Sequence, residues 1–318
     1  MNALKQSMDN SLQKTNTQKG SNVHPYVVLD GRVVEKCNAG IDLDERLAAY
    51  GEGWFDTLRS YAGTVADPAG HFGRLCSGAR YLGVPMPGKL ATDHQYLQVI
   101  RTLLEANRAM DDQTRIRVMV WTGNRDPGYL STSTPDECRF LAVSAPLEDE
   151  QPEPVSLAVS SLTRIPHRAL PAEVKWTSSM HYILAAREAK EKKADDALLL
   201  TGEGFLSEAT IANIFWKKGD RICTPDESCD ILPGITRKML IRVLTNSGMT
   251  VDEGSFRMRD LEGADLVWLT NSVRGLYPVI SIGGKSCAWD EEFWCTLRQR
   301  YEENLRSCLQ PLPEPMKP

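Results

Sequence analysis

The sequence predicts an α/β protein built from two α+β domains, and three observations support this prediction. Strand-like runs of Val, Ile, Leu and aromatic residues alternate with segments whose apolar residues recur at helical spacing. The chain has 318 residues, which is enough for two ordinary domains. Residues 146–154 read PLEDEQPEP, an acidic stretch with three prolines that resists both helix and central strand. We therefore expect the linker between the domains at 146–154.

This linker divides the chain into a smaller and a larger domain. Residues 1–24 are polar and have no apolar period, so we expect a disordered N-terminal tail there. The small N-terminal domain is then expected at 25–145 and the larger C-terminal domain at 155–310, with a short tail at 311–318.

The first domain should begin with a β-hairpin. Tyr26–Leu29 and Arg32–Val34 are strand-like runs joined by Asp30-Gly31, a dipeptide typical of two-residue hairpin turns. Its further elements are predicted from composition and apolar spacing. They are strands at 54–61 and 115–121 and helices at 71–81 and 94–109.

The second domain mixes short strands with two helices. The predicted strands cover 155–160, 197–200, 213–216, 221–223, 266–269 and 279–281. The predicted helices cover 179–193 and 235–246, and Gly248 is a natural left-handed end for the second.

Composition and charge favour a small-molecule partner. The formal net charge is −5 and the chain lacks a long Lys/Arg run, so neither nucleic acid nor an anionic membrane surface is indicated. We find no membrane-spanning run and no signal peptide, and we expect a cytoplasmic protein. The eight cysteines include no CxxC pair, which favours reduced thiols and no metal site.

Two charged residues could carry chemistry. Lys175 follows a strand-like run and precedes a helix, and a buried lysine loses its proton readily and can attack a carbonyl group. A surface position is the ordinary alternative for a lysine. Glu208 lies between a turn and an apolar strand, where a carboxylate either faces solvent or has a buried partner.

Two further stretches could bind an anion. Residues 230–240 read DILPGITRKML, which places Pro-Gly and a threonine where a helix begins and exposes backbone donors. Residues 269–272 read LTNS and end a strand with three small polar side chains. Arg74 could complete an anion site by bidentate pairing. Each stretch alone is also an ordinary helix start or turn.

Lys175, Glu208, residues 230–240 and residues 269–272 follow one another along the chain. This order of motifs resembles that of fold-type IV pyridoxal-phosphate enzymes. That family includes branched-chain and D-amino-acid aminotransferases and aminodeoxychorismate lyase. The resemblance implies a D-amino-acid-aminotransferase-like fold with pyridoxal 5′-phosphate in a cleft between the domains, and a homodimer. It also implies that Lys175 is the Schiff-base lysine and that Glu208 pairs with the pyridine nitrogen. The remaining cofactor contacts that it implies are Arg74, Leu232, Ile235, Thr236, Asn271 and Ser272.

Two stretches favour the lyase branch. Residues 212–219, ANIFWKKG, are similar to the Ala-Asn-Leu-Phe-Trp stretch of aminodeoxychorismate lyases, and residues 270–279, TNSVRGLYPV, resemble their Asn-Ser-Leu-Arg-Gly segment. The chain lacks the Thr-Gly-Thr turn of branched-chain aminotransferases and the Arg-x-His pair of D-amino-acid aminotransferases. The resemblance therefore implies conversion of 4-amino-4-deoxychorismate to 4-aminobenzoate and pyruvate.

Two other functions stay open. One is a class IV aminotransferase acting on branched-chain, D- or other amino acids, and the other is a non-catalytic protein that binds a phosphate-bearing ligand. By the same resemblance, the substrate would meet side chains from a strand and from a loop of the first domain. These residues are Phe55 and Thr57 of the strand and Arg125 and Tyr129 of the loop. Asp56 of the same strand is also expected in the cleft, and an ordinary half-buried strand is the alternative for Phe55, Asp56 and Thr57.

Overall fold

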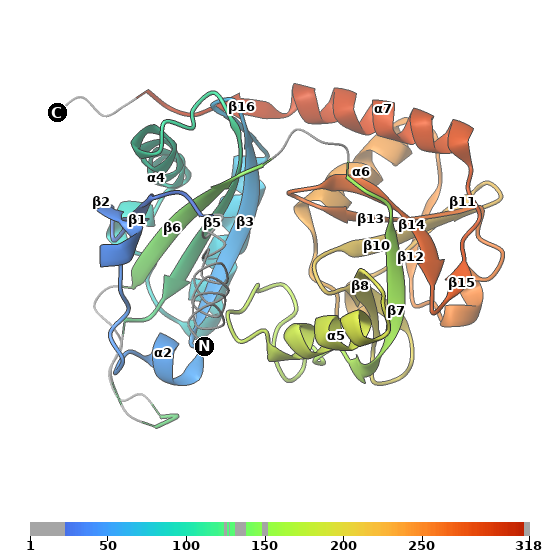
Figure 1. Ribbon diagram of the computed structural model, residues 1–318, viewed down its shortest axis with the longest axis horizontal. Helices are drawn as coiled ribbons and strands as arrows, with labels where there is room; N and C mark the ends of the chain where they lie inside the picture. The colour runs from blue at the N-terminus through green and yellow to red at the C-terminus, as the bar shows by residue number, and fades with distance from the viewer. Residues whose placement is uncertain (1–22, 124–125, 127, 131–137, 148–151, 315–318) are drawn as a thin grey trace, which may run out of the picture.

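The computed structural model describes residues 23–123, 126, 128–130, 138–147 and 152–314, which form two domains (Figure 1). The N-terminal domain is a seven-stranded sheet in the order β16-β4-β3-β5-β6-β1-β2. Its strands are β1 (Tyr26–Leu29), β2 (Arg32–Glu35), β3 (Gly53–Tyr61), β4 (Thr64–Ala66), β5 (Gln113–Trp121), β6 (Arg139–Pro146) and β16 (Leu309–Pro311). Its helices are α2 (Arg46–Tyr50), α3 (Pro68–Leu82) and α4 (Asp93–Ala106), with single turns of 3-10 helix at η1 (Lys36–Asn38) and η2 (Gly88–Leu90).

The predicted hairpin is confirmed. Strands β1 and β2 pair antiparallel, and Leu29 lies opposite Arg32. Asp30 and Gly31 have φ values of +49° and +77°, so both turn residues are left-handed. This conformation matches the twist of the flanking strands, and Asp-Gly tolerates it well.

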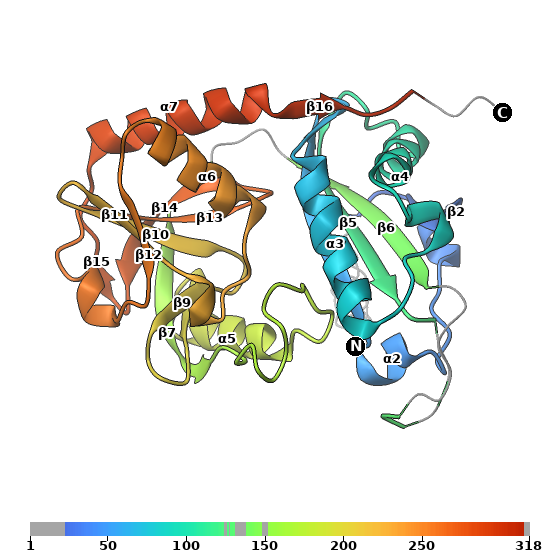
Figure 2. The same cartoon turned by 180° about the vertical axis from the view of Figure 1, so that it is seen from behind.

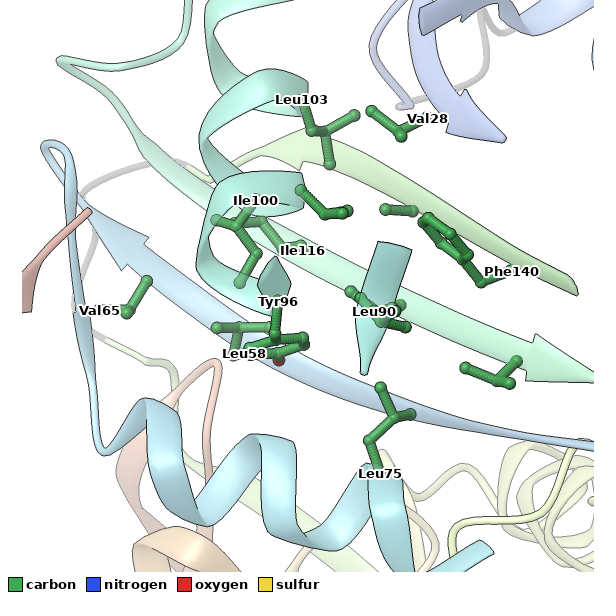
Figure 3. Packing of buried hydrophobic residues seen from close by; sticks show 14 of the residues in the cluster. Val28, Leu58, Val65, Leu75, Leu90, Tyr96, Ile100, Leu103, Ile116 and Phe140 are labelled. Carbon is green, nitrogen blue, oxygen red and sulfur yellow. The ribbon is translucent and has the colours of Figure 1, made fainter. Parts of the chain in front are cut away.

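The core of this domain lies between one face of the sheet and helices α3 and α4 (Figures 2 and 3). The sheet contributes Leu58, Ile116 and Phe140, which pack against Leu75 of α3 and Tyr96 of α4. Because side chains alternate along a strand, the other face of β3 and β5 is turned away from this core. That second face is available to line a site.

The C-terminal domain is built around a closed circuit of strands. Its sheet runs β12-β11-β10-β13-β14-β7-β8-β9, and β9 also pairs with β10. Its strands are β7 (Val155–Thr163), β8 (Asp196–Leu200), β9 (Leu206–Ala209), β10 (Asn213–Lys218), β11 (Arg221–Pro225), β12 (Val251–Gly254), β13 (Leu266–Asn271), β14 (Gly275–Ile282) and β15 (Lys285–Ser286). Its helices are α5 (Met180–Glu191), α6 (Ile235–Asn246) and α7 (Glu291–Ser307), with η3 (Glu227–Cys229) and η4 (Met258–Leu261).

The end of the chain crosses back to the first domain. Helix α7 packs against the C-terminal domain, and β16 then pairs antiparallel with β4 of the N-terminal sheet (Figure 1). The carbonyl oxygens of Pro313 and Glu314 accept hydrogen bonds from α4. The expectation of a tail from 311 onwards is therefore wrong for 311–314, and helix α7 was not predicted.

Other expectations need smaller corrections. Strand β6 was not predicted, and it includes Pro146, so the linker begins one residue later than expected. Helix α4 ends at Ala106 and not at Ala109. Lys175 lies in the loop between β7 and α5, and no strand of the C-terminal domain precedes it directly. Residues 1–22, 148–151 and 315–318 of the expected tails and linker lie outside the described residues.

No helix among the described residues has both the length and the apolar character needed to cross a membrane.

Two glycines of α3 provide a matched test of the core. A methyl group added at Gly78 would overlap the indole ring of Trp54. The ring is anchored, because its Nε1 donates a hydrogen bond of 2.7 Å to the carbonyl oxygen of Leu75. A methyl group at Gly73 meets no atom within 4 Å. Gly78→Ala should therefore destabilise the protein by about 1–3 kcal/mol, whereas Gly73→Ala should stabilise it by roughly 0.5–1 kcal/mol. Thermal and denaturant midpoints measure both, and equal midpoints for the two variants would refute this packing.

Candidate active site

A cavity of about 870 Å³ is lined by both domains. Cavities that hold cofactors and small substrates have volumes of roughly 300–1,000 Å³. Phe55 and Thr57 line it from the outward face of β3, and Lys175, Glu208 and Thr236 line it from the C-terminal domain. The site is therefore built where the two domains meet.

Lys175 is held by the backbone of the other domain. Its carbonyl oxygen accepts a hydrogen bond of 2.8 Å from the N–H of Phe55, and the N–H of Thr177 donates one of 2.9 Å to Gly53. Trp176 thereby forms an antiparallel bridge with Trp54. The loop extends the free edge of β3 by one short strand, which fixes the position from which the lysine side chain enters the cavity.

The amino group of Lys175 lies in an environment that favours its neutral form. Its Nζ lies 5.2 Å from the centroid of the Phe55 ring. Burial lowers the pKa of Lys175 to about 8, and the positive charge of Arg74 acts in the same direction. The carboxylates of Glu208 and Asp56 oppose this shift but do not cancel it.

Glu208 is a buried carboxylate whose oxygens both have partners. Its Oε1 accepts a hydrogen bond of 2.5 Å from the hydroxyl of Tyr182. Its Oε2 accepts one of 3.1 Å from Asn213 Nδ2 and one of 3.0 Å from the N–H of Leu232. These three donors come from α5, β10 and the loop before α6, so several elements fix the direction of the carboxylate.

A positive charge accompanies Glu208. Arg164 Nε lies 3.1 Å from Glu208 Oε1, and Arg164 Nη1 lies 3.0 Å from His181 Nε2. Burial lowers the pKa of His181 to about 4, and the charge of Arg164 adds to this effect. His181 is therefore neutral at pH 7. The carboxylate and guanidinium groups offset each other in the buried site.

The cavity also presents hydrogen-bond donors that lack partners. Helix α6 begins after Gly234 with no side-chain cap, and its first residues are buried. A helix start buried without a cap leaves backbone N–H groups unpaired. The hydroxyl of Thr270 is also buried without a hydrogen-bond partner. A side chain at Gly234 would overlap Asn213 Oδ1, so only glycine keeps this helix start open.

Arg74 and Asn271 line the same cavity as these donors. Arg74 lines the cavity from α3. Asn271 Oδ1 accepts hydrogen bonds of 3.0 Å from the N–H of Val273 and 2.7 Å from the N–H of Arg274. Asn271 Nδ2 donates to the hydroxyl of Tyr277. The side chain of Asn271 thus stabilises the loop. Asn271 also lines the cavity, as predicted.

The structure brings together most of the residues expected in the site. All of the following line the same cavity: Lys175, Glu208, Arg74, Leu232, Ile235, Thr236, Asn271, Ser272, Phe55 and Thr57. Asp56 does not line it, because strand alternation turns its side chain to the helix side of the sheet.

The described residues of the loop after β5 do not line the cavity of their own chain. Tyr129 is 92% exposed and does not line the cavity of its own chain. Buried Arg46 holds this loop, since its Nη1 donates to the carbonyl oxygens of Asp126 at 2.9 Å and Gly128 at 2.6 Å. Tyr129 therefore does not reach the cavity of its own chain, and its contact with the substrate stays a prediction. Arg125 lies outside the described residues.

Several residues of the site were not predicted. Arg115 and Arg117 line the cavity from β5, and their spacing of two in a predicted strand was a usable signal. Asn213 occurred in the quoted stretch ANIFWKKG, but nothing local indicated its bond to Glu208. Arg164 and Tyr182 reach Glu208 only through tertiary structure, so no local pattern could have identified them.

The chain is similar to known proteins of one family. The family model described as amino-transferase class IV matches residues 53–282. A putative branched-chain-amino-acid aminotransferase of Methanocaldococcus jannaschii is 29% identical over 81% of this chain and 88% of its own length. An aminodeoxychorismate lyase of Bacillus subtilis is 28% identical over 80% of this chain and 86% of its own length.

The fold also matches solved structures. The branched-chain aminotransferase of the archaeon Thermoproteus uzoniensis, crystallised with norvaline, has a TM-score of 0.81 at 24% identity. The match covers 91% of this chain and 100% of that chain. At this identity the likeness concerns the fold alone.

The environment of Lys175 predicts how its reactivity depends on pH. Only the neutral amine attacks an aldehyde, and this form accumulates as the pH rises through the pKa of about 8. Reductive alkylation with a small aldehyde, followed by mass spectrometry of the Lys175 peptide, should show a rate that rises with a midpoint near pH 8. A midpoint near pH 10.4, the value of free lysine, would contradict the described burial.

Proposed function

Because this chain belongs to the amino-transferase class IV family, we propose that it is a pyridoxal 5′-phosphate-dependent lyase that converts 4-amino-4-deoxychorismate to 4-aminobenzoate and pyruvate. Enzymes of this family use pyridoxal 5′-phosphate. The relatives include an aminodeoxychorismate lyase and a branched-chain aminotransferase at similar identity. An aminotransferase reaction is therefore the second candidate.

The donors at the start of α6 support binding of the phosphate group. The uncapped N–H groups after Gly234 and the unpartnered hydroxyl of Thr270 are orphaned donors that a phosphate would satisfy. Arg74 would add a positive charge beside them. Ile235 and Thr236 would contribute through the first turn of the helix, and Ser272 through the neighbouring loop.

The position of Glu208 supports binding of the pyridine ring. Three hydrogen bonds fix its carboxylate, so it can hold a proton on a ring nitrogen in one defined direction. Leu232 would lie against the ring. When bound, pyridoxal 5′-phosphate withdraws electrons from the substrate carbon that carries the amino group.

Lys175 is the residue we assign to proton transfer. With a pKa of about 8, part of the Lys175 population is neutral near pH 7 and can accept a proton. In the lyase reaction, Lys175 Nζ would take the proton from the substrate carbon that carries the amino group. The bond between the ring carbon and the ether oxygen would then break as the ring becomes aromatic, and the released enolpyruvate would take up a proton and become pyruvate. In the aminotransferase reaction, Lys175 would return this proton to the cofactor carbon.

Two arginines are the observation that favours the lyase reaction over the aminotransferase reaction. Arg115 and Arg117 line the cavity, and within the described residues neither guanidinium forms an ion pair with a carboxylate. Burial lowers the pKa of Arg117, and the charge of Arg115 adds to this effect. Two unpaired cations favour a substrate with two negative charges, and aminodeoxychorismate has two carboxylates. The lyase-like stretches at 212–219 and 270–279 point the same way.

A non-catalytic phosphate-binding protein is the third candidate. Binding of a phosphate alone would require the donors at the start of α6 but neither the amine of Lys175 nor the carboxylate of Glu208, which also line the cavity. Their joint presence therefore favours an enzyme.

We also propose that the protein is a homodimer. Buried Arg46 holds the loop that carries Tyr129 and Leu130, and these side chains are 92% and 80% exposed. Large apolar side chains that are rigidly held and exposed favour a protein interface. Sedimentation velocity should give the mass of a dimer, and Leu130→Asp should shift it towards the monomer. A monomer for the unmodified protein would refute this proposal.

The reaction is tested with substrates of both candidate enzymes. The loaded enzyme should form 4-aminobenzoate and pyruvate in equal amounts from aminodeoxychorismate, with no keto acid added. Lys175→Ala should reduce this rate by at least about 10²–10⁴-fold. L- and D-amino acids should leave the visible absorption of the bound cofactor unchanged. Bleaching by an amino acid, without turnover of aminodeoxychorismate, would refute the lyase reaction and favour the aminotransferase.

A further inference from the structure

Asp56 is a fully buried carboxylate that the proposed reaction does not use. It lies on β3 between Phe55 and Thr57, but its side chain points to the opposite face of the sheet. There its Oδ1 accepts hydrogen bonds from Arg74 Nε, at 2.7 Å, and from Arg74 Nη2. Its Oδ2 pairs with His71 Nδ1 at 2.6 Å. Both partners of this carboxylate come from α3.

A buried carboxylate in this position requires compensation. Burial alone would raise the pKa of Asp56, but the charges and hydrogen bonds of Arg74 and His71 outweigh burial and lower it. Asp56 is therefore ionised at neutral pH. His71 and Arg74 are three residues apart, so they lie on one face of α3, and both reach the same carboxylate.

The geometry of Arg74 leaves one edge of its guanidinium available. Asp56 engages Nε and Nη2, and within the described part of the chain no hydrogen bond engages Nη1. Arg74 also lines the cavity in which the first turn of α6 and the hydroxyl of Thr270 present their unpaired donors. An arginine held along one edge by a carboxylate can offer the remaining edge to a phosphate.

We propose that Asp56 is a positioning residue that orients the guanidinium of Arg74 towards the cofactor phosphate, with His71 as the second donor that holds Asp56 in place. This proposal rests on the proposed function, since it concerns the same cofactor. Asp56 acts through Arg74 and does not touch the substrate. It therefore extends the phosphate site to the helix side of β3, behind the cavity wall.

Asp56 also has an effect that opposes phosphate binding. Its negative charge repels a phosphate dianion, so its removal could strengthen binding. The ion pair with Arg74 offsets the charge of Asp56, and Arg74 has many rotamers when nothing holds it. Orientation should therefore outweigh repulsion.

The test compares two ligands that differ only in the phosphate. Dissociation constants of the cofactor-free full-length protein are measured for pyridoxal 5′-phosphate and for pyridoxal. Asp56→Asn should weaken binding of pyridoxal 5′-phosphate by about ten- to one-hundredfold, the range expected when one hydrogen bond to a charged group is lost. Binding of pyridoxal should be unchanged. Ser60→Ala is the matched control, because Ser60 is buried on the same face of β3 and does not line the cavity.

A milder variant covers the case in which Asp56→Asn fails to fold, which circular dichroism would detect. His71→Gln keeps the carboxylate and should weaken binding of pyridoxal 5′-phosphate, by a smaller factor, again without affecting pyridoxal. Equal losses for both ligands, no loss, or tighter binding of pyridoxal 5′-phosphate would overturn the positioning role. An unmodified protein that binds neither ligand would instead overturn the proposed function.

Discussion

Two backbone hydrogen bonds between the Lys175 loop and the edge of β3 fix the position of the reactive lysine between the two domains. They join Lys175 to Phe55 and Thr177 to Gly53. A lysine is costly to bury without support, so its position must be fixed by structure that does not depend on its charge. The bridge provides such support, and it makes β3 common to the core and to the site.

Strand alternation then gives β3 two separate functions. Towards the helices, Trp54 and Leu58 pack in the core and Asp56 pairs with α3. Towards the C-terminal domain, Phe55 and Thr57 line the cavity. A shift of one residue in the pairing of β3 with β5 would exchange these faces and lose the core and the site together. The crossing of β16 onto β4 adds a second connection between the domains.

The charges around the cavity explain why an anionic ligand suits it. Five arginines and Lys175 line it, against three carboxylates, Asp195, Asp196 and Glu208, and the arginines are Arg74, Arg115, Arg117, Arg164 and Arg274. The buried carboxylate of Asp56 lies behind the cavity wall. Asp56 and Glu208 already pair with Arg74 and Arg164, which leaves Arg115 and Arg117 without such partners among the described residues. A cofactor phosphate and a carboxylate substrate would restore the balance.

Local patterns in the sequence were sufficient for the hairpin at Asp30-Gly31 and for helix α6. They left the positions of Lys175 and Glu208 open, and the family resemblance was needed to assign both residues to the site. They could not indicate which distant side chains hold Glu208, because Arg164 and Tyr182 approach it only after folding. Helix α7 was missed, although its apolar residues Trp294, Leu297 and Tyr301 are spaced for one face. The sequence could not show that Tyr129 is exposed in its own chain, because a motif gives a position in the chain but not the direction of a loop.

The most direct test of the account is to identify the residue that binds the cofactor. The protein loaded with pyridoxal 5′-phosphate is reduced with borohydride, digested and analysed by mass spectrometry. The account predicts one phosphopyridoxyl group per chain, located on Lys175. A phosphopyridoxyl group on another lysine, or none after loading, would contradict it.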